Sequence, residues 1–161
     1  MDKPFAITLD VGSSLANKTG SWRTERPVYL NSLPPCNDAC PAGEDIQGWL
    51  YAAEEGRYED AWRVLTRDNP FPAVMGRVCY HPCQTACNRA QLDQPVGINS
   101  VERFLGDAAL QSGWAFAPAA AATGKRVLVI GAGPSGLSAA YHLNQAGHEV
   151  VVRDAGPKPG G

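Results

Sequence analysis

Apolar residues recur with helical spacing in three stretches of the chain. The first stretch begins near Asp45, which can cap a helix, and ends at Gly56. Four of its residues share an apolar face: Ile46, Trp49, Leu50 and Ala53. The second stretch runs from about Glu59 to Asp68, and Asn69-Pro70 ends it because a residue before proline disfavours the helical conformation. These two stretches predict a helical hairpin.

The third helical stretch begins near Asn99 or Ser100, either of which can cap it, and ends before Gly113. Four of its residues are expected to face a core: Val101, Phe104, Leu105 and Ala108. Residues 1–35 show little periodicity and are rich in Gly, Ser, Asn and Pro, which predicts an extended N-terminal arm. The pattern therefore predicts an α-helical domain over residues 36–113.

Beyond residue 113 the pattern changes from helical to strand-like. Residues 114–124 are rich in alanine and carry Pro118, which predicts a linker between two domains. A strand (126–130), a glycine turn, a helix (135–146) and a second strand (149–153) then follow. This order predicts the first β-α-β unit of a Rossmann-like α/β domain over residues 125–161. Because a whole dinucleotide fold needs more strands, we expect this chain to be only part of an enzyme.

The glycine turn, Gly131-Ala132-Gly133-Pro134-Ser135-Gly136, has the spacing of a dinucleotide-binding motif. Gly131 permits the tight turn, Gly133 lets the backbone approach a pyrophosphate, and Gly136 lets the helix pack close to the sheet. Asp154, at the end of the next strand, is expected to accept hydrogen bonds from ribose hydroxyls, which disfavours a 2′-phosphorylated cofactor here. The pattern predicts FAD or NAD bound at six residues: Gly131, Gly133, Pro134, Ser135, Gly136 and Asp154. The alternative is that this turn only joins a strand to a helix, because glycine turns also occur in folds without cofactors.

The five cysteines fall into two groups, C-x3-C-P at Cys36 and Cys40 and C-x3-C-x3-C at Cys79, Cys83 and Cys87. The first group matches the tail of a bacterial ferredoxin run, in which neighbouring cysteines serve different clusters. Iron–sulfur ligation is the favoured interpretation, and structural zinc and inert thiols are the alternatives. His81 lies within the second group as a candidate ligand, although a hydrogen-bonding role is commoner for such a histidine.

Composition and charge narrow the class of protein. The chain has 161 residues, 14 basic and 16 acidic side chains, and a formal net charge of −2. This balance of charges gives no sign of a nucleic-acid or anionic-membrane partner, because neither has a basic surface to bind. Its apolar stretches are shorter than a membrane span, and its N-terminus has no signal-peptide pattern, so we expect a cytoplasmic protein. An odd number of cysteines argues against a complete disulfide framework.

Several of these motifs together resemble the N-terminal half of the glutamate synthase small-subunit family, which includes the N-terminal region of dihydropyrimidine dehydrogenase. The resemblance spans about residues 34–161. It rests on four motifs: Cys-x3-Cys-Pro-Ala-Gly-x-Asp-Ile (36–46), Gly-Arg-Val-Cys (76–79) with its following cysteines, Ile-Asn-Ser-Val-Glu (98–102) and the glycine turn. The segment Asp10–Ser14 and Pro34-Pro35-Cys36 look most like the branch that works with dissimilatory sulfite reductase in sulfur metabolism.

The resemblance implies a set of cluster ligands. One [4Fe-4S] cluster would be held by Cys40, Cys79 and Cys83, with Glu102 as the fourth ligand. A second would use Cys36 and Cys87 together with two cysteines upstream of Cys36. Residues 1–35 contain no cysteine, so we expect one cluster and leave a second open.

The resemblance also implies an activity. NAD(P)H would reduce FAD, and the clusters would pass electrons to or from a partner enzyme or subunit. The nicotinamide site would lie beyond Gly161, so no catalytic residue is assigned in this chain. The alternatives are a glutamate synthase small subunit and, in a different class, a zinc-braced interaction module.

Overall fold

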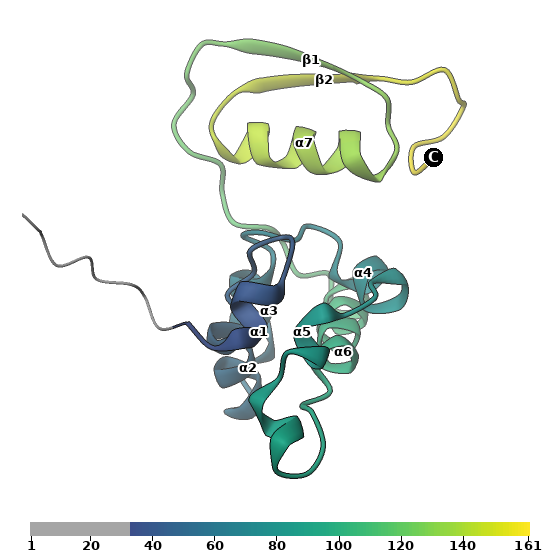
Figure 1. Ribbon diagram of the computed structural model, residues 1–161. Helices are drawn as coiled ribbons and strands as arrows, with labels where there is room; N and C mark the ends of the chain where they lie inside the picture. Colours follow the sequence, from purple (N-terminus) through teal and green to yellow (C-terminus); the bar gives the residue numbers. More distant parts are fainter. Residues whose placement is uncertain (1–32) are drawn as a thin grey trace, which may run out of the picture. The chain divides into compact units, whose positions relative to one another are not determined.

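The computed structural model describes residues 33–161 (Figure 1). The predicted extended arm therefore lies outside the described residues except for its last three. The elements, in order, are α1 (Pro35–Ala39), α2 (Ile46–Glu54), α3 (Tyr58–Leu65), α4 (Pro72–Val78), α5 (Pro82–Thr85), a 3-10 turn (Asn88–Gln91), α6 (Ile98–Ser112), β1 (Arg126–Ile130), α7 (Pro134–Gln145) and β2 (Glu149–Arg153). Helices thus come first and a β-α-β unit follows, which is the predicted order.

The predicted helical hairpin is formed by α2 and α3. Asp45 caps α2 by accepting a 3.0 Å hydrogen bond from the amide of Gly48. The buried residues of the hairpin form the centre of the helical core: Ile46, Trp49, Ala52, Ala61 and Leu65. Ala52 was not among the residues expected on the apolar face, whereas Leu50 and Ala53 are only partly buried.

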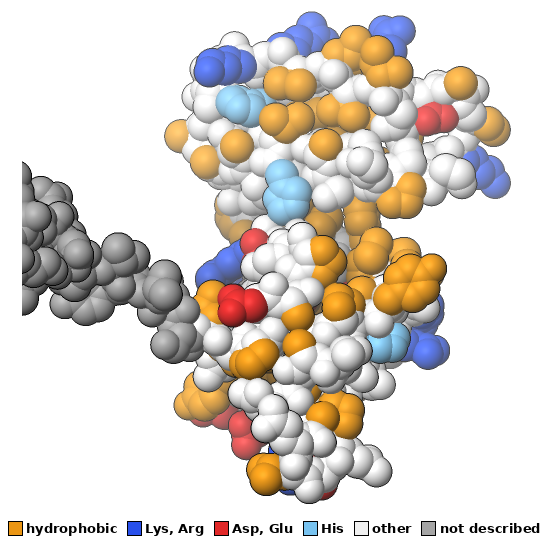
Figure 2. All heavy atoms as spheres, viewed as in Figure 1, with side chains coloured by type: hydrophobic (Ala, Val, Ile, Leu, Met, Phe, Trp, Pro, Cys, Tyr) orange, Lys and Arg blue, Asp and Glu red, His pale blue; other side chains and the backbone are white. Residues whose placement is uncertain are grey.

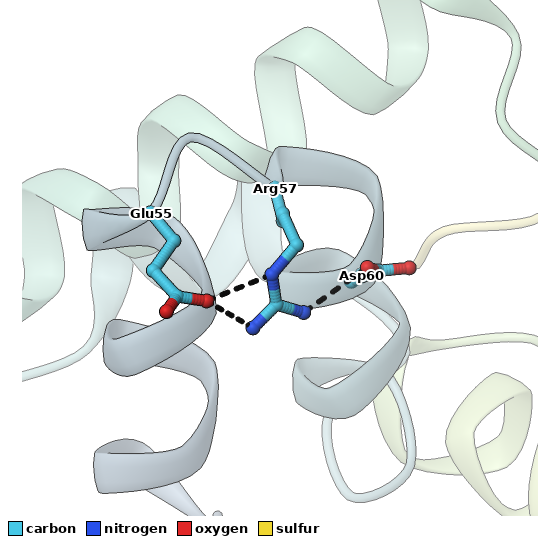
Figure 3. Close-up of polar contacts among 3 residues, drawn as sticks. All are labelled: Glu55, Arg57 and Asp60. Carbon is cyan, nitrogen blue, oxygen red and sulfur yellow. Dashed lines mark hydrogen bonds and ion pairs between the residues drawn. The ribbon is translucent and has the colours of Figure 1, made fainter.

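A polar network links the two helices at the solvent surface. The Nε of Arg57 donates to Oε2 of Glu55 at 2.9 Å, and another guanidinium nitrogen donates to Asp60 at 3.1 Å (Figure 3). Arg57 precedes the first residue of α3, so one side chain connects the end of α2 with the first turn of α3. The Arg57 guanidinium also holds the pKa of Glu55 below its usual value.

Two glycines let α4 and α6 pack with their backbones in contact. A Cβ on Gly76 would overlap the backbone of Arg103, and a Cβ on Gly106 would overlap the backbone of Ala73. Larger residues at these positions would push the helices apart. This packing matters for the site because Cys79 directly follows α4, and Glu102 lies within α6.

Two details of the third predicted helix were wrong. Phe104 was expected to face the core, but it is 50% exposed and packs edge-on against Tyr58 at a centroid distance of 5.1 Å. Helix α6 turns Leu105 inward and leaves Phe104 at the rim. Neither Asn99 nor Ser100 caps the helix, because α6 already begins at Ile98 and Gly97 occupies the cap position.

The glycine turn joins β1 to α7, and β2 pairs with β1 in parallel, with Leu128 opposite Val151. The two strands run side by side, and α7 lies along them (Figure 1). Gly147 follows α7 with a φ of +85°, a conformation that favours glycine. The predicted β-α-β unit is therefore present with two parallel strands, and the helix bounds differ from the prediction by one residue. Leu128, Ile130 and Val152 of the strands are exposed, and hydrophobic side chains are visible on the surface of this unit in Figure 2.

The segment predicted as a linker, residues 114–124, contains no helix or strand but is packed. The ring of Phe116 stacks on Trp62 of α3 at 5.1 Å and contacts Tyr141 of α7 at 4.9 Å. The hydroxyl of Tyr141 donates to the carbonyl of Thr66 at 2.9 Å. Across residues 33–161, no helix is long and apolar enough to cross a membrane.

Candidate metal centre and nucleotide turn

Three of the five cysteines line one cavity of about 290 Å³. Cys40 follows α1, Cys79 follows α4, and Cys83 lies in α5, so three separate elements supply the thiols. Glu102 of α6 lines the same cavity. The set of four proposed cluster ligands is thus brought together around one space.

The environment of these thiols favours a cation among them. Burial raises the pKa of Cys83 to about 11, and charge repulsion from Cys40 and Cys79 adds to the increase. Burial also raises the pKa of Cys40 above its usual value. Thiolates are the form that binds metals, and a metal ion stabilises them against both burial and mutual repulsion.

Glu102 is a buried carboxylate, with only 6% of its surface exposed. Burial, together with the charge of Glu44, raises its pKa to about 8. No lysine or arginine among residues 33–161 forms an ion pair with it. Because buried carboxylates are normally paired or bound to metal, Glu102 has the environment expected of a ligand.

The segment between Cys79 and Cys83 has an unusual backbone. His81 has a φ of 42°, the only left-handed non-glycine conformation among the described residues. This turn lets the amide of His81 donate to the sulfur of Cys79 at 3.2 Å. His81 also lines the cavity, and its buried Nδ1 has no hydrogen-bond partner within residues 33–161.

Cys36 and Cys87 lie apart from this cavity. Cys36 lies in α1 and lines a different, open pocket with Gln47 and Val96. The two thiols are close enough for Cys87 to contribute to the raised pKa of Cys36, although burial is the main cause. Backbone amides, first that of Val96, lower the pKa of Cys87. The structure thus separates the cysteines into a group of three and a pair.

The donor set has the chemistry of an iron–sulfur site. In the part of the chain that the structure describes, no three His, Cys, Asp or Glu side chains converge closely enough to hold one metal ion. The three thiols and Glu102 line one cavity, and His81 lines it as well. Thiolates are the usual ligands of iron–sulfur clusters.

The glycine turn has the features that a pyrophosphate requires. Gly131 has a φ of +105°, which favours glycine. A Cβ on Gly136 would overlap the carbonyl oxygen of Gly131, whereas a Cβ on Gly133 would meet no protein atom within 4 Å. The absence of a side chain at Gly133 is therefore not required by packing, and it leaves room for a ligand.

Residues at the start of α7 border the cysteine cavity. Pro134 and Ser135, both predicted to bind the cofactor, line it together with Ser138. Asp154 lies elsewhere, at the end of β2, where its oxygens accept hydrogen bonds from the amides of Ala132 and Gly156, each at 2.6 Å. The bond from Ala132 fastens the glycine turn to the end of the strand, a role the sequence did not suggest for Asp154.

Two further buried polar residues were missed by sequence reasoning. Glu44 and Asn69 line the cavity and are 7% and 5% exposed. Asn69 was noted only as the residue before Pro70 that ends a helix, and Glu44 lay among ordinary loop residues. No sequence motif marks either residue, because their contacts join distant parts of the chain. Asn69 lies 25 residues from Glu44 and 33 residues from Glu102, and it donates a hydrogen bond to each.

Comparison with known families agrees with this geometry. Residues 17–114 match the family model described as dihydropyrimidine dehydrogenase domain II, 4Fe-4S cluster. Residues 129–161 match the NAD(P)-binding Rossmann-like domain. The predicted cofactor classes, an iron–sulfur cluster and a dinucleotide, are confirmed at the level of these two families.

Similar proteins come from several organisms. The chain is 43% identical over 123 residues to a glutamate synthase [NADH] of Schizosaccharomyces pombe, covering 76% of this chain and 6% of that protein. It is 38% identical over 130 residues to the glutamate synthase [NADPH] small chain of Mycobacterium tuberculosis, covering 80% and 27%. It is 36% identical over 126 residues to the NADPH-Fe(3+) oxidoreductase subunit beta of Geobacter sulfurreducens, covering 77% and 19%.

The chain therefore spans less than a third of the length of each of these relatives. One of the three is named an oxidoreductase, the names of the other two carry NADH or NADPH, and each aligned region includes most of the present chain. The resemblance to the glutamate synthase small-subunit family is confirmed. The chain belongs to the family of 4Fe-4S cluster domains typified by domain II of dihydropyrimidine dehydrogenase, and it continues into a NAD(P)-binding Rossmann-like segment.

Proposed function

We propose that this chain is the N-terminal electron-transfer part of an NAD(P)H-dependent iron–sulfur flavoprotein oxidoreductase. Residues 36–113 form its cluster domain, residues 114–124 link the two parts, and residues 125–161 begin the FAD domain. Cys40, Cys79, Cys83 and Glu102 hold one [4Fe-4S] cluster. Once bound, such a cluster accepts and donates single electrons.

A single observation carries this proposal. The proposed ligands line the same cavity as Pro134 and Ser135, which belong to the glycine turn and the first turn of α7. The turn presents backbone amides at a helix N-terminus, which is where a dinucleotide pyrophosphate binds. The proposed dinucleotide-binding residues are Gly131, Gly133, Pro134, Ser135 and Gly136 in the turn, together with Asp154, whose carboxylate would accept hydrogen bonds from ribose hydroxyls. Cluster and flavin would then be close neighbours, as electron transfer between them requires.

The residues around the cavity have distinct tasks. The thiols of Cys40, Cys79 and Cys83 give up their protons on binding the metal, and the amide of His81 stabilises the resulting charge on Cys79. Pro72, Gly76 and Gly106 belong to the close packing of α4 against α6 that holds Cys79 near Glu102. Apolar residues such as Ile46 and Ile98 limit the access of water.

A second cluster at Cys36 and Cys87 is not part of the proposal. These two cysteines lie apart from the cavity, and residues 1–35 supply no cysteine to complete a set of four. They remain candidate ligands that would need two donors from elsewhere.

The partner is proposed from the relatives. Relatives named as a small chain or as a subunit beta belong to assemblies, so we propose that electrons pass to or from a partner subunit or enzyme. The glutamate synthase names favour a partner that makes glutamate. A sulfur-metabolism partner is the second candidate and rests on the resemblance of Asp10–Ser14 and Pro34-Pro35-Cys36.

Iron and acid-labile sulfide per chain, measured after anaerobic reconstitution, test the cluster assignment. We expect about four irons per chain and a brown protein. Cys83→Ala should lose this iron, whereas the matched variant Cys87→Ala should retain it. A colourless zinc protein, or a Cys83→Ala variant with all of its iron, would refute the assignment. About eight irons per chain would show that a second cluster exists.

A further inference from the structure

Asn69 has the contacts of a residue that orients the fourth cluster ligand. Its side-chain nitrogen donates to Oε1 of Glu102 at 2.7 Å and to Oε1 of Glu44 at 3.0 Å. All three side chains are buried and line the cavity that contains Cys40, Cys79 and Cys83. One amide group thus joins two carboxylates that face the proposed cluster site.

The orientation of this amide is fixed by the backbone. The oxygen Oδ1 of Asn69 accepts a 3.0 Å hydrogen bond from the amide of Phe71, two residues further on. This is an Asx-turn, a local conformation that Asn and Asp favour. Because the backbone amide is a donor, the oxygen of Asn69 must face it, and the nitrogen must face the two carboxylates.

The bridge leaves part of Glu102 free. Asn69 binds Oε1, and no hydrogen bond within residues 33–161 involves Oε2. A carboxylate held by one oxygen and open at the other is suited to bind a metal through the open oxygen. Hydrogen-bonded partners of this kind fix the orientation of metal-ligating carboxylates.

We propose that Asn69 is a positioning residue for the cluster: its amide, fixed by Phe71, holds Glu102 by one carboxylate oxygen and presents the other to the iron. This inference rests on the proposed function, in which Glu102 is a cluster ligand. Glu44 is the second attachment point of the bridge and keeps the amide nitrogen directed into the cavity.

A double-mutant cycle between Asn69 and Glu102 tests the proposal. The cycle comprises the parent chain, Asn69→Leu, Glu102→Ala and the double variant, each reconstituted anaerobically. The readouts are the rate of iron loss to a ferrous chelator and the cluster potential from a redox titration followed by electron paramagnetic resonance. We expect Asn69→Leu to retain its cluster about 10–100-fold less well than the parent. In the Glu102→Ala background, the same change should have no further effect.

A second variant keeps the test valid if Asn69→Leu does not fold. Asn69→Ser retains an oxygen that can accept from Phe71 and form the related ST-turn, but it is too short to reach the carboxylates. Asn37→Leu is the matched control, because Asn37 is also buried, donates to Asp45 at 3.3 Å, and does not line the cavity. It should leave cluster retention and potential unchanged.

The outcomes distinguish a failure of the role of Asn69 from a failure of the role of Glu102 as a cluster ligand. If Glu102→Ala changes retention or potential and Asn69→Ser does not, Asn69 has no positioning role. If the effect of the Asn69 variants persists in full without Glu102, Asn69 acts only through the general fold. If Glu102→Ala itself changes nothing, the proposed ligand set fails, and the inference fails with it.

Discussion

The carbonyl oxygen of Gly131 occupies the position that a Cβ on Gly136 would take. The first and last glycines of the turn are therefore in direct backbone contact. We expect Gly136→Ala to destabilise the chain by about 1–3 kcal/mol, the usual cost of overpacking, because neither the carbonyl group nor the helix backbone can move freely. Urea-induced unfolding measures this loss, and an unchanged midpoint would contradict it.

The matched variant at Gly133 should behave in the opposite way. A Cβ on Gly133 meets no protein atom within 4 Å, and its φ of −71° suits any residue. We expect Gly133→Val to leave the folding of the chain nearly unchanged. In a full-length version it should abolish FAD binding, because the side chain would fill the space of the pyrophosphate. Normal flavin content in that variant would show that the dinucleotide binds elsewhere.

Gln84 connects the cysteine segment to the helix that carries Glu102. Its Oε1 accepts a 2.8 Å hydrogen bond from the amide of Asn99, in the first turn of α6. No side chain of α6 caps this end, so Gln84 replaces the missing cap from another element. We expect Gln84→Leu to cost about 0.5–2 kcal/mol of stability, as the loss of a helix cap does. Thermal unfolding and iron content measure the effect, and Gln47→Leu, on the exposed side of α2, provides the control.

Sequence patterns predicted the regular elements of this fold better than its site. The hairpin, the long third helix and the β-α-β unit each carry a repeated apolar period, so local rules were sufficient. The short helices α1, α4 and α5 begin at or next to Pro35, Pro72 and Pro82 and are too short to show a period. Phe104 was assigned to the core from spacing alone, but tertiary packing decided which edge of the helix faces inward.

The cysteine spacing likewise predicted part of the site. It marked the five thiols as candidate ligands, and the family resemblance supplied their division into three and two. Cys40, Cys79 and Cys83 line one cavity, and Cys36 lines a different pocket. The buried Glu44–Asn69–Glu102 bridge could not be predicted, because no motif connects residues so far apart. The contact of Asp154 with the glycine turn could not be predicted either, since its hydrogen bond from the amide of Ala132 joins residues 22 positions apart.

The Arg57 network should make stability depend on pH in a defined direction. Arg57 lowers the pKa of Glu55, so the pair stabilises the fold at pH values above the ordinary carboxyl range. That contribution is lost as the pH falls through the lowered pKa of Glu55. Arg57→Met should therefore reduce Tm at pH 7, and the difference from the parent should shrink as the pH falls below the ordinary carboxyl range and through the lowered pKa of Glu55. Arg67→Met is the control, because it removes no ion pair among the described residues. Its Tm difference from the parent should not depend on pH in this way.

Replacement of Glu102 by cysteine gives the sharpest test of its role as a ligand. A carboxylate is a harder ligand than a thiolate, so Glu102→Cys should keep the cluster and change its reduction potential and its paramagnetic resonance spectrum. Glu102→Gln should show an intermediate behaviour, because an amide oxygen can still bind but carries no charge. Cys40→Ala, by contrast, should lose iron outright. If Glu102→Ala, Glu102→Gln and Glu102→Cys all retain the iron content, potential and spectrum of the parent, Glu102 is not a ligand. The fourth position would then belong to another group on the cavity wall, where the structure places His81 together with the carboxylates of Glu44 and Asp68.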